Sequence, residues 1–274
     1  MKENLTNEKN QLEQLVSSVL KSPKYRNVSG DLIRNIGANQ LSKRQSLKAA
    51  VKATKDKLHQ IGGAYFLKKP NYDLWLKKLE EARNLGDERL FHEECAEMMS
   101  YHYSTRERLK IIDQFYTSIF SFIPHVKSIV DIACGFNPLF IPWMPISSQV
   151  KYYAYDVYKD LIDFINDFMV IFDVQGCAEV RDVTQDMPKV SADVAFVLNA
   201  IPCLEEIEKW VGLKVLESIN SNFLVVSFPV KSLCGREKNM RTYYEAAFKK
   251  LTREKNWTIR KLEFRTELVF LITK

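Results

Sequence analysis

Long hydrophobic stretches are missing from the sequence. No run of apolar residues approaches the roughly 18 that a membrane-spanning helix needs. The first residues, from Met1 to Leu5, contain no hydrophobic signal-peptide core. We therefore expect a cytoplasmic protein that does not interact with a membrane.

Cysteine and histidine are also sparse. The chain contains five cysteines, without a Cys-x-x-Cys pair, and four scattered histidines. An odd number of widely spaced cysteines indicates reduced thiols rather than a disulfide framework or a zinc site. We expect no metal centre, and we expect the histidines to be ordinary surface or core residues.

Net positive charge is concentrated in the first quarter of the chain. The whole chain carries +6, but residues 1–69 contain fourteen Lys and Arg residues against five Asp and Glu residues, so the remainder is slightly acidic. This asymmetry predicts a basic N-terminal module that binds a polyanion, joined to a near-neutral catalytic domain.

The most informative basic segment is a helix predicted over residues 43–58. Its packing face consists of residues at helical spacing: Leu47, Val51, Thr54 and Leu58. Its opposite face carries four cations at the same spacing: Arg44, Lys48, Lys52 and Lys55. A solvated face is the usual explanation of such a stripe, but a stripe of one sign gains no ion pairs along the helix. We interpret these four residues as an RNA-binding surface.

Helical patterns dominate the first part of the chain. Apart from the basic helix, they are predicted over residues 7–22, 31–36, 73–84 and 87–101. A further helix should run from Ser104 to about Phe120, because Ser104 and Glu107 have the spacing of a capping box. We divide the chain into a helical basic domain, residues 1–103, and a catalytic domain, residues 104–274.

From residue 127 onward, strand and helix patterns alternate. Strands are predicted at 127–132, 151–155, 177–181, 193–199, 222–228, 257–264 and 266–273, and helices near 138–146, 158–173, 204–219 and 239–253. Alternation predicts a parallel sheet with helices on both faces, and the last two strands must form a hairpin. The predicted fold class is α/β: the Rossmann-like, seven-stranded fold of S-adenosylmethionine-dependent methyltransferases, with a helical N-terminal domain.

The ends of the first two strands predict a cofactor site. The first strand leads to Gly135, which has no Cβ and lets a ligand approach the main chain. The second ends in Asp156, whose carboxylate can accept hydrogen bonds from ribose hydroxyls. A single glycine followed by Phe136 and Pro138 does not suit a pyrophosphate, and Asp131 within the first strand favours a cationic ligand. We therefore favour S-adenosylmethionine over NAD; an ordinary βα turn with a loop aspartate is the alternative.

The third and fourth strands add polar candidates. Asp182, followed by Val183, ends the third strand, where a carboxylate can accept a hydrogen bond from the adenine amine. Arg106 is a candidate partner for the methionine carboxylate of the cofactor, whereas we expect Arg108 to be a surface residue. Asn199 follows the fourth strand, where a methyl acceptor is expected, and either a contact with the acceptor or a structural role fits it.

Neither His nor Glu presents itself as a general base along this edge. A ring nitrogen with a free lone pair, such as guanine N7, can attack a sulfonium methyl without first losing a proton. Positioning would then supply most of the catalysis, an effect that reaches roughly 7–11 kcal/mol in favourable cases. We predict no catalytic acid or base.

Five segments together resemble a known family. They are Lys57-Leu58-His59-Gln60-Ile61, Ser104-Thr105-Arg106-Glu107-Arg108, Asp131-Ile132-Ala133-Cys134-Gly135-Phe136-Asn137-Pro138-Leu139, Pro202-Cys203-Leu204-Glu205 and Val226-Ser227-Phe228-Pro229-Val230-Lys231-Ser232-Leu233. The chain resembles, over nearly its whole length, the aminoglycoside-resistance 16S ribosomal RNA (guanine-N7) methyltransferases. Cys234 before Gly235 departs from the glycine expected there in many relatives.

The resemblance implies a function and a set of site residues. The function is methylation of N7 of a decoding-site guanine of 16S rRNA in the assembled 30S subunit, which confers aminoglycoside resistance, with the N-terminal domain docking on the subunit. The cofactor would be held by Arg106, Gly135, Asp156, Asp182 and Val183, to which we add Asp131 and Ala133 from the same motif. The target side would be lined by Phe228, Lys231, Ser232 and Arg236, beside Asn199.

Other functions remain open. One is methylation of an adenine in the same rRNA helix, and another is methylation of a small molecule. A third is RNA binding without catalysis, which the three aspartates at successive strand ends argue against.

Overall fold

The computed structural model describes residues 2–232 and 239–274. The N-terminal half is helical: α1 (Lys2–Leu20), α2 (Gly30–Lys43), α3 (Leu47–Leu58), the π-helix η1 (His59–Gly63), α4 (Tyr72–Leu85), α5 (Glu88–Met99), α6 (Tyr103–Leu109) and α7 (Ile112–Phe120). The rest alternates: β1 (Ser128–Ile132), the 3-10 helix η2 (Asn137–Trp143), β2 (Lys151–Asp156), α8 (Lys159–Ile171), β3 (Gln175–Val180), β4 (Ser191–Leu198), α9 (Ile201–Ile207), α10 (Val211–Ser218), β5 (Asn220–Pro229), α11 (Met240–Thr252), β6 (Thr258–Glu263) and β7 (Glu267–Thr273).

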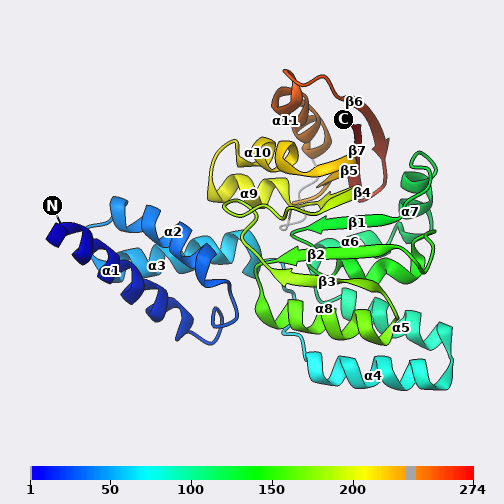
Figure 1. Cartoon of the computed structure of the whole chain (residues 1–274), viewed down its shortest axis with the longest axis horizontal. Coiled ribbons are helices and arrows are strands. Elements are labelled where there is room, and N and C mark those ends of the chain that lie inside the picture. Colours follow the sequence, from blue (N-terminus) through cyan, green and yellow to red (C-terminus); the bar gives the residue numbers. More distant parts are fainter. Residues whose placement is uncertain (1, 233–238) are drawn as a thin grey trace.

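The strands form one seven-stranded sheet in the order β3-β2-β1-β4-β5-β7-β6 (Figure 1). The first five strands are parallel, and β7 pairs antiparallel with both β5 and β6. This confirms the predicted α/β fold, including the hairpin at the end of the chain.

Helices cover both faces of the sheet because successive strand residues alternate between two hydrophobic clusters. On one face, Ile129 and Phe196 belong to a cluster with α4, α5, α7 and α8. On the other, Val130 and Ala195 belong to a cluster with α9, α10 and α11. The sheet is therefore buried between two helical layers, as its apolar strands require.

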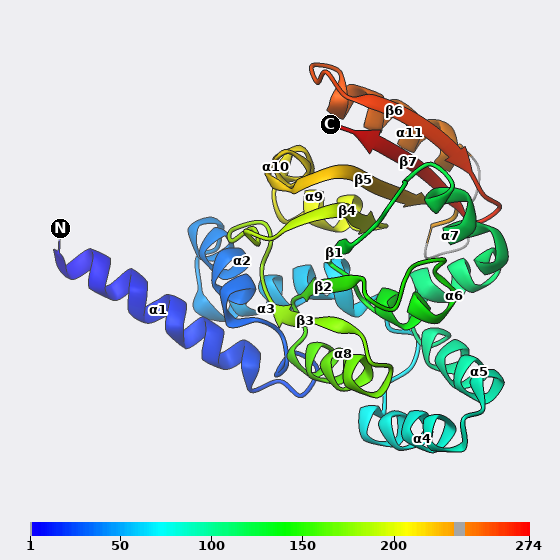
Figure 2. The same cartoon turned by 45° about the vertical axis from the view of Figure 1, so that its right-hand side comes forward.

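Helices α1–α3 form a third cluster of their own, which includes Leu15, Ile33 and Leu58. They lie beside the ends of β2 and β3 in both views (Figures 1 and 2). Helices α4 and α5, which the predicted boundary after residue 103 assigns to the N-terminal domain, instead share the core of the sheet through Trp75 and Phe91. By packing, the basic helical unit is α1–α3.

Several predicted helices are interrupted in the structure. The helix predicted over 43–58 begins only at Leu47, with Ser46 as its N-cap, because α2 extends to Lys43 and Arg44 lies in the extended connection. The helix predicted near 138–146 is a 3-10 helix that contains Pro142, whose ring is incompatible with an α-helix interior. The segment 204–219 forms two helices, with Trp210 in a left-handed conformation between them.

The predicted capping box is wrong. His102 is the N-cap of α6, so Ser104 lies inside the helix and its hydroxyl contacts His102 Nδ1 at 3.1 Å. The helix ends at Leu109, and α7 continues the chain after a short break.

No helix among residues 2–232 and 239–274 has the length and apolar character to cross a membrane. The four described cysteines form no disulfide.

Candidate functional site

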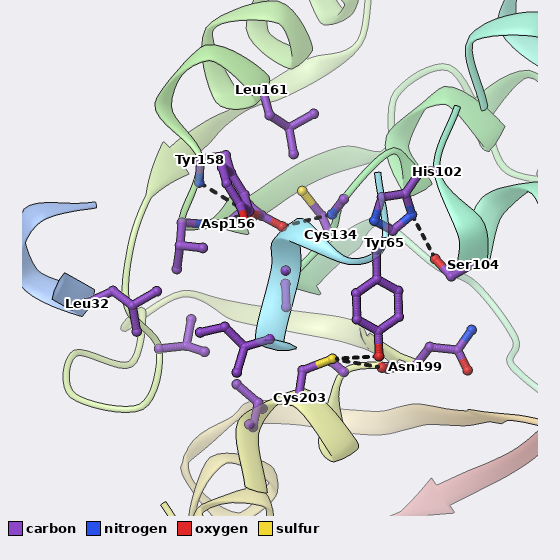
Figure 3. A pocket seen from close by; sticks show the side chains of 18 of the residues that line it. Leu32, Tyr65, His102, Ser104, Cys134, Asp156, Tyr158, Leu161, Asn199 and Cys203 are labelled. Carbon is purple, nitrogen blue, oxygen red and sulfur yellow. Dashed lines mark hydrogen bonds between the residues drawn. The ribbon is translucent and has the colours of Figure 1, made fainter. Parts of the chain in front are cut away.

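The main site candidate is a cavity at the carboxyl ends of the parallel strands, where α/β proteins bind ligands. Its empty volume is about 1000 Å³. Residues that follow β1, β2, β3 and β4 form one side, and Leu32 of α2, Leu58 of α3 and Gly62 of η1 form part of the other. The close-up shows the side chains converging on this space (Figure 3). Both the sheet and the basic helical unit therefore build the cavity.

Gly135 and Asp156 meet at this cavity as the sequence predicts. Gly135 has a φ of +51°, a left-handed conformation that glycine adopts without strain. Its N–H donates to Asp156 Oδ2 over 2.9 Å, while Asp156 Oδ1 accepts from the N–H groups of Val157 at 2.7 Å and Tyr158 at 3.3 Å. Burial raises the pKa of the Asp156 carboxyl, and these three donors oppose the shift. The carboxylate is held rigidly at the cavity wall.

Asp182 is fixed in a similar way at the end of β3. Its Oδ1 accepts from the backbone N–H of Thr184 at 3.0 Å and from the Thr184 hydroxyl at 2.6 Å. Its Oδ2 accepts from the amide of Asn35, on α2, at 3.2 Å. Asp182 and Val183 both line the cavity, as does Ala133 after β1.

Two residues of the predicted cofactor set lie outside the cavity lining. Asp131 is buried under the turn, where its Oδ2 accepts from Asn137 at 2.8 Å and Tyr152 at 2.6 Å. The Asp131 carboxylate thus stabilises the turn after β1 through its hydrogen bond with Asn137. The Arg106 side chain is 44% exposed and contacts Tyr103 and Glu107 at the surface of α6. The geometry gives neither residue a direct contact with a ligand in the cavity.

Arg108, which we expected at the surface, is buried and lines the cavity, as does Arg181 after β3. Its side chain is 1% exposed, and its Nε lies 2.8 Å from Glu267 Oε1 on β7. Its Nη1 also donates to Asn137 over 2.8 Å. The sequence around Arg108 carries no signal of this burial, because Glu267 lies 159 residues further along the chain.

A second cavity, with an empty volume of about 620 Å³, adjoins the first and shares Tyr65, Ser104 and Asn199 with it. Asn199 has a left-handed backbone, and its buried Oδ1 finds no hydrogen-bond partner among the described residues. Lys231 and Ser232, two of the predicted target-side residues, line this second cavity. A buried amide oxygen without a partner is costly, so the shared wall offers an acceptor to a ligand.

The other two target-side candidates are not placed there. Phe228 is buried in the sheet's core, where its ring stacks on Tyr244 at a centroid distance of 4.9 Å and contacts Phe248 and Phe270. These contacts show that the Phe228 side chain points into the helix layer that contains α11 rather than into either cavity. Arg236 lies outside the described residues.

Aromatic and titratable groups that sequence reasoning missed also line the two cavities. Burial lowers the pKa of His102 to about 4, so its imidazole is neutral at physiological pH. Tyr65 stacks on His102, and its hydroxyl lies 3.2 Å from Cys203 Sγ. Glu107 and Glu267 also line the second cavity, although the sequence presents no glutamate as a general base along this edge. Glu267 is paired with Arg108, and Glu107 accepts from Lys110 at 2.6 Å.

The predicted RNA-binding residues lie on the surface of the basic helical unit. Lys48 and Lys52 are exposed on α3, one turn apart, and Lys55 is half-buried on the same helix. Arg44 is exposed in the connection before α3. Three of the four cations thus share a helix, and the fourth adjoins it. The described residues contain no group of three or more His, Cys, Asp or Glu side chains that could hold a metal ion.

Known proteins resemble the chain along almost its full length. The family model described as Ribosomal RNA methyltransferase (FmrO) matches residues 21–271. A protein of Micromonospora echinospora named 16S rRNA (guanine(1405)-N(7))-methyltransferase is 36% identical over 265 residues, which are 96% of this chain and 97% of that protein.

Two solved structures share the fold. The 16S rRNA methyltransferase RmtF, in complex with S-adenosyl-L-homocysteine, superposes with a TM-score of 0.83 at 25% identity, covering 96% of this chain and 98% of RmtF. The 16S rRNA methylase RmtB superposes with a TM-score of 0.76 at 29% identity, over 96% of this chain and 98% of RmtB. The chain therefore belongs to the FmrO family of ribosomal RNA methyltransferases.

Proposed function

We propose that this protein transfers the methyl group of S-adenosylmethionine to N7 of guanine 1405 of 16S rRNA, the activity in the name of its Micromonospora relative. The observation that carries the proposal is the pair of adjoining cavities, which share Asn199. One has the anchoring groups for a nucleoside cofactor, and the other can accept a base beside it.

The first cavity fits S-adenosylmethionine. Asp156 can accept hydrogen bonds from the ribose, and Asp182 with Val183 can recognise the adenine. Arg108 lines the same cavity, and its guanidinium, which is paired with Glu267, can also interact with the methionine carboxylate, the role that the sequence suggested for Arg106. When bound, S-adenosylmethionine supplies an electrophilic methyl group on a sulfonium.

The second cavity fits a nucleophile that carries no proton to remove. Guanine N7 has a free lone pair, so the neutral His102 and the paired Glu267 need not act as bases. We infer that the amide of Asn199 and the side chains of Lys231 and Ser232 orient the base, while Glu107 and Glu267 favour the positive charge that a methylated guanine acquires. Positioning then accounts for the catalysis, up to roughly 7–11 kcal/mol in favourable cases.

The substrate has to be brought to this cavity with its target base unstacked. The major groove of an RNA helix is deep and narrow, so N7 of a paired guanine is out of reach unless the nucleotide is flipped out. We infer that Arg44, Lys48, Lys52 and Lys55 contact phosphates of the assembled 30S subunit and that the modified guanine lies in the decoding site. Methylation there would confer aminoglycoside resistance, and such a substrate places the protein in the cytoplasm.

The experiment is to incubate the protein with unmodified 30S subunits and methyl-labelled S-adenosylmethionine, and to digest the RNA to nucleosides. Label in 7-methylguanosine supports the proposal. Label in a methyladenosine would make the protein an adenine methyltransferase. An absence of label on active subunits would leave methylation of a small molecule, or RNA binding without catalysis.

A further inference from the structure

The basic helical unit makes a direct hydrogen bond with a carboxylate of the cofactor cavity. Asn35 lies on α2, and its Nδ2 is 3.2 Å from Asp182 Oδ2 and 3.2 Å from Thr184 Oγ1. The Thr184 hydroxyl in turn donates to Asp182 Oδ1 over 2.6 Å. Asn35, Asp182 and Thr184 therefore form a closed set of hydrogen bonds between two parts of the fold that are 147 residues apart in the chain.

This arrangement limits how the Asp182 carboxylate can turn. The two donors of Thr184 occupy Oδ1, and Asn35 supplies the donor that the structure gives to Oδ2. Asp182 is buried, with 4% of its surface exposed. Without Asn35, its Oδ2 would lose the donor that the structure gives it, and the carboxylate would be less restrained. Leu32, one turn before Asn35 on α2, lines the same cavity. Helix α2 thus lines the cavity with Leu32 and holds the Asp182 carboxylate with Asn35.

We propose that Asn35 is a positioning residue for the cofactor, and that the basic helical unit controls the affinity of the cavity for the cofactor through Asn35. This inference rests on the proposed function, because it takes the cavity to be the S-adenosylmethionine site. Helix α2, which carries Asn35, and helix α3, which carries the basic face, pack together in one hydrophobic cluster through residues such as Ile33 and Leu58. RNA binding to α3 and cofactor binding at Asp182 therefore act on one packed unit. Coupling of this kind is reciprocal: each ligand changes the affinity for the other by the same factor.

The same interface offers a matched control. Asn27 Nδ2 donates to Asp160 Oδ2 over 2.7 Å, and this bond also joins the basic helical unit to the catalytic domain. Asp160 is not among the residues that line the cavity. Asn27→Ala therefore removes a side-chain hydrogen bond of the interface without touching the carboxylate that would contact the cofactor.

The experiment measures the affinity of the full chain for S-adenosylhomocysteine by isothermal titration calorimetry. Asn35→Ala should weaken binding about tenfold, equivalent to about 1.4 kcal/mol, whereas Asn27→Ala should stay within about twofold of the wild type. In the background of Asp182→Ala, the further change Asn35→Ala should have no effect beyond about twofold, because the carboxylate that it positions is gone. Asn35→Asp keeps the shape of the side chain but places a second carboxylate at Asp182, so it should weaken binding at least as much as Asn35→Ala.

A second titration tests the coupling. Saturating 30S subunits should raise the affinity of the wild type for S-adenosylhomocysteine by a larger factor than they raise that of Asn35→Ala. Unfolding temperatures measured without ligand identify a variant that fails to fold, for which Asn35→Asp serves as the alternative.

The outcomes separate the two proposals. Equal losses in Asn35→Ala and Asn27→Ala would show that only the interface matters, and unchanged affinity in Asn35→Ala and Asn35→Asp would show that Asn35 does not position the cofactor. Equal effects of 30S subunits on the wild type and Asn35→Ala would show that Asn35 transmits no coupling. Each of these results overturns the inference alone. A wild type that binds no S-adenosylhomocysteine would overturn the proposed function and the inference with it.

Discussion

The backbone N–H of Gly135 donates a hydrogen bond to the carboxylate of Asp156 over 2.9 Å. This bond ties the turn after β1 to the end of β2, and it explains why the glycine and the aspartate act as one element of the cavity. The left-handed φ of Gly135 aims its N–H at the carboxylate. The same carboxylate keeps acceptor capacity for a ligand, because each oxygen can accept more than one hydrogen bond.

Replacing Asp156 should therefore damage the cofactor site specifically. Asp156→Ala removes the acceptor of three backbone N–H groups and the proposed ribose contact, so we expect the affinity for S-adenosylhomocysteine to fall at least about tenfold, or about 1.4 kcal/mol. Calorimetry measures this, and filter binding with 30S subunits in the absence of cofactor should show unchanged RNA affinity. Unchanged cofactor affinity in both Asp156→Ala and Asp182→Ala would contradict the assignment of the cavity.

The buried pair of Arg108 and Glu267 should dominate the stability of this edge of the sheet. Each side chain is 1% exposed, and removing one partner of a buried ion pair leaves an uncompensated charge, at a cost of roughly 3–5 kcal/mol. Glu267→Gln should lower the free energy of unfolding by about that amount in urea denaturation. The control is Arg106→Met on the same helix, which should change it by less than about 0.5 kcal/mol. Similar destabilisation in both variants would refute the distinction between the two arginines.

Asp131 should give stability a characteristic pH dependence. Burial raises the pKa of its carboxyl to about 7 from the ordinary 3.8, although Tyr152, Asn137 and Arg108 act in the opposite direction. The folded protein therefore holds a proton that the unfolded chain releases. The stability from this proton is fully present below about pH 4 and is lost as the pH rises through about 7.

Asp131→Asn lacks this titration but can keep both hydrogen bonds through its amide oxygen. The free energy of unfolding of the wild type relative to Asp131→Asn should thus fall between about pH 4 and 7, by at most about 1.4 kcal/mol per pH unit. Denaturant titrations at several pH values measure this difference between the two proteins. Both proteins contain His102, so its titration cancels. Parallel profiles for the two proteins would show that Asp131 titrates normally.

The cations of α3 should account for part of the salt dependence of RNA binding. Lys48→Glu with Lys52→Glu should reduce the magnitude of the slope of log affinity against log salt by about 0.7–0.9 for each phosphate that the variant no longer neutralises. Methylation of saturating 30S subunits should persist. The charge-matched control is Lys77→Glu with Lys127→Glu, two exposed lysines outside the basic helical unit, which should leave the slope unchanged. Equal slopes for both double variants would remove α3 from the RNA interface.

Local patterns sufficed where one segment determines both the structure and the site. The parallel sheet and the positions of Gly135, Asp156 and Asp182 could be predicted because each of these residues lies at the end of an apolar strand, and parallel strands bring their carboxyl ends to one edge. Residues whose environment comes from distant segments could not be predicted. Arg108 is buried by Glu267, and Asn35 meets Asp182, across separations of 159 and 147 residues.

Side-chain direction was the other source of error. The family resemblance implies that Phe228 lines the target side, but its ring enters the helix layer that contains Tyr244 and Phe248. Arg44 has the spacing of the α3 cations, but α2 extends to Lys43 and leaves Arg44 in the connection. In both cases the position is set by packing that the local sequence does not reveal.

The most direct test of the central claim is to locate the methyl group on the RNA. Unmodified 30S subunits are incubated with S-adenosylmethionine and either the wild type or Asp156→Ala, and the 16S rRNA is then cleaved by chemistry selective for N7-methylguanine and mapped by primer extension. The account predicts one wild-type-dependent cleavage, at guanine 1405, which is strongly reduced with Asp156→Ala. Cleavage at another guanine, or none with a wild type that binds S-adenosylhomocysteine, would contradict it.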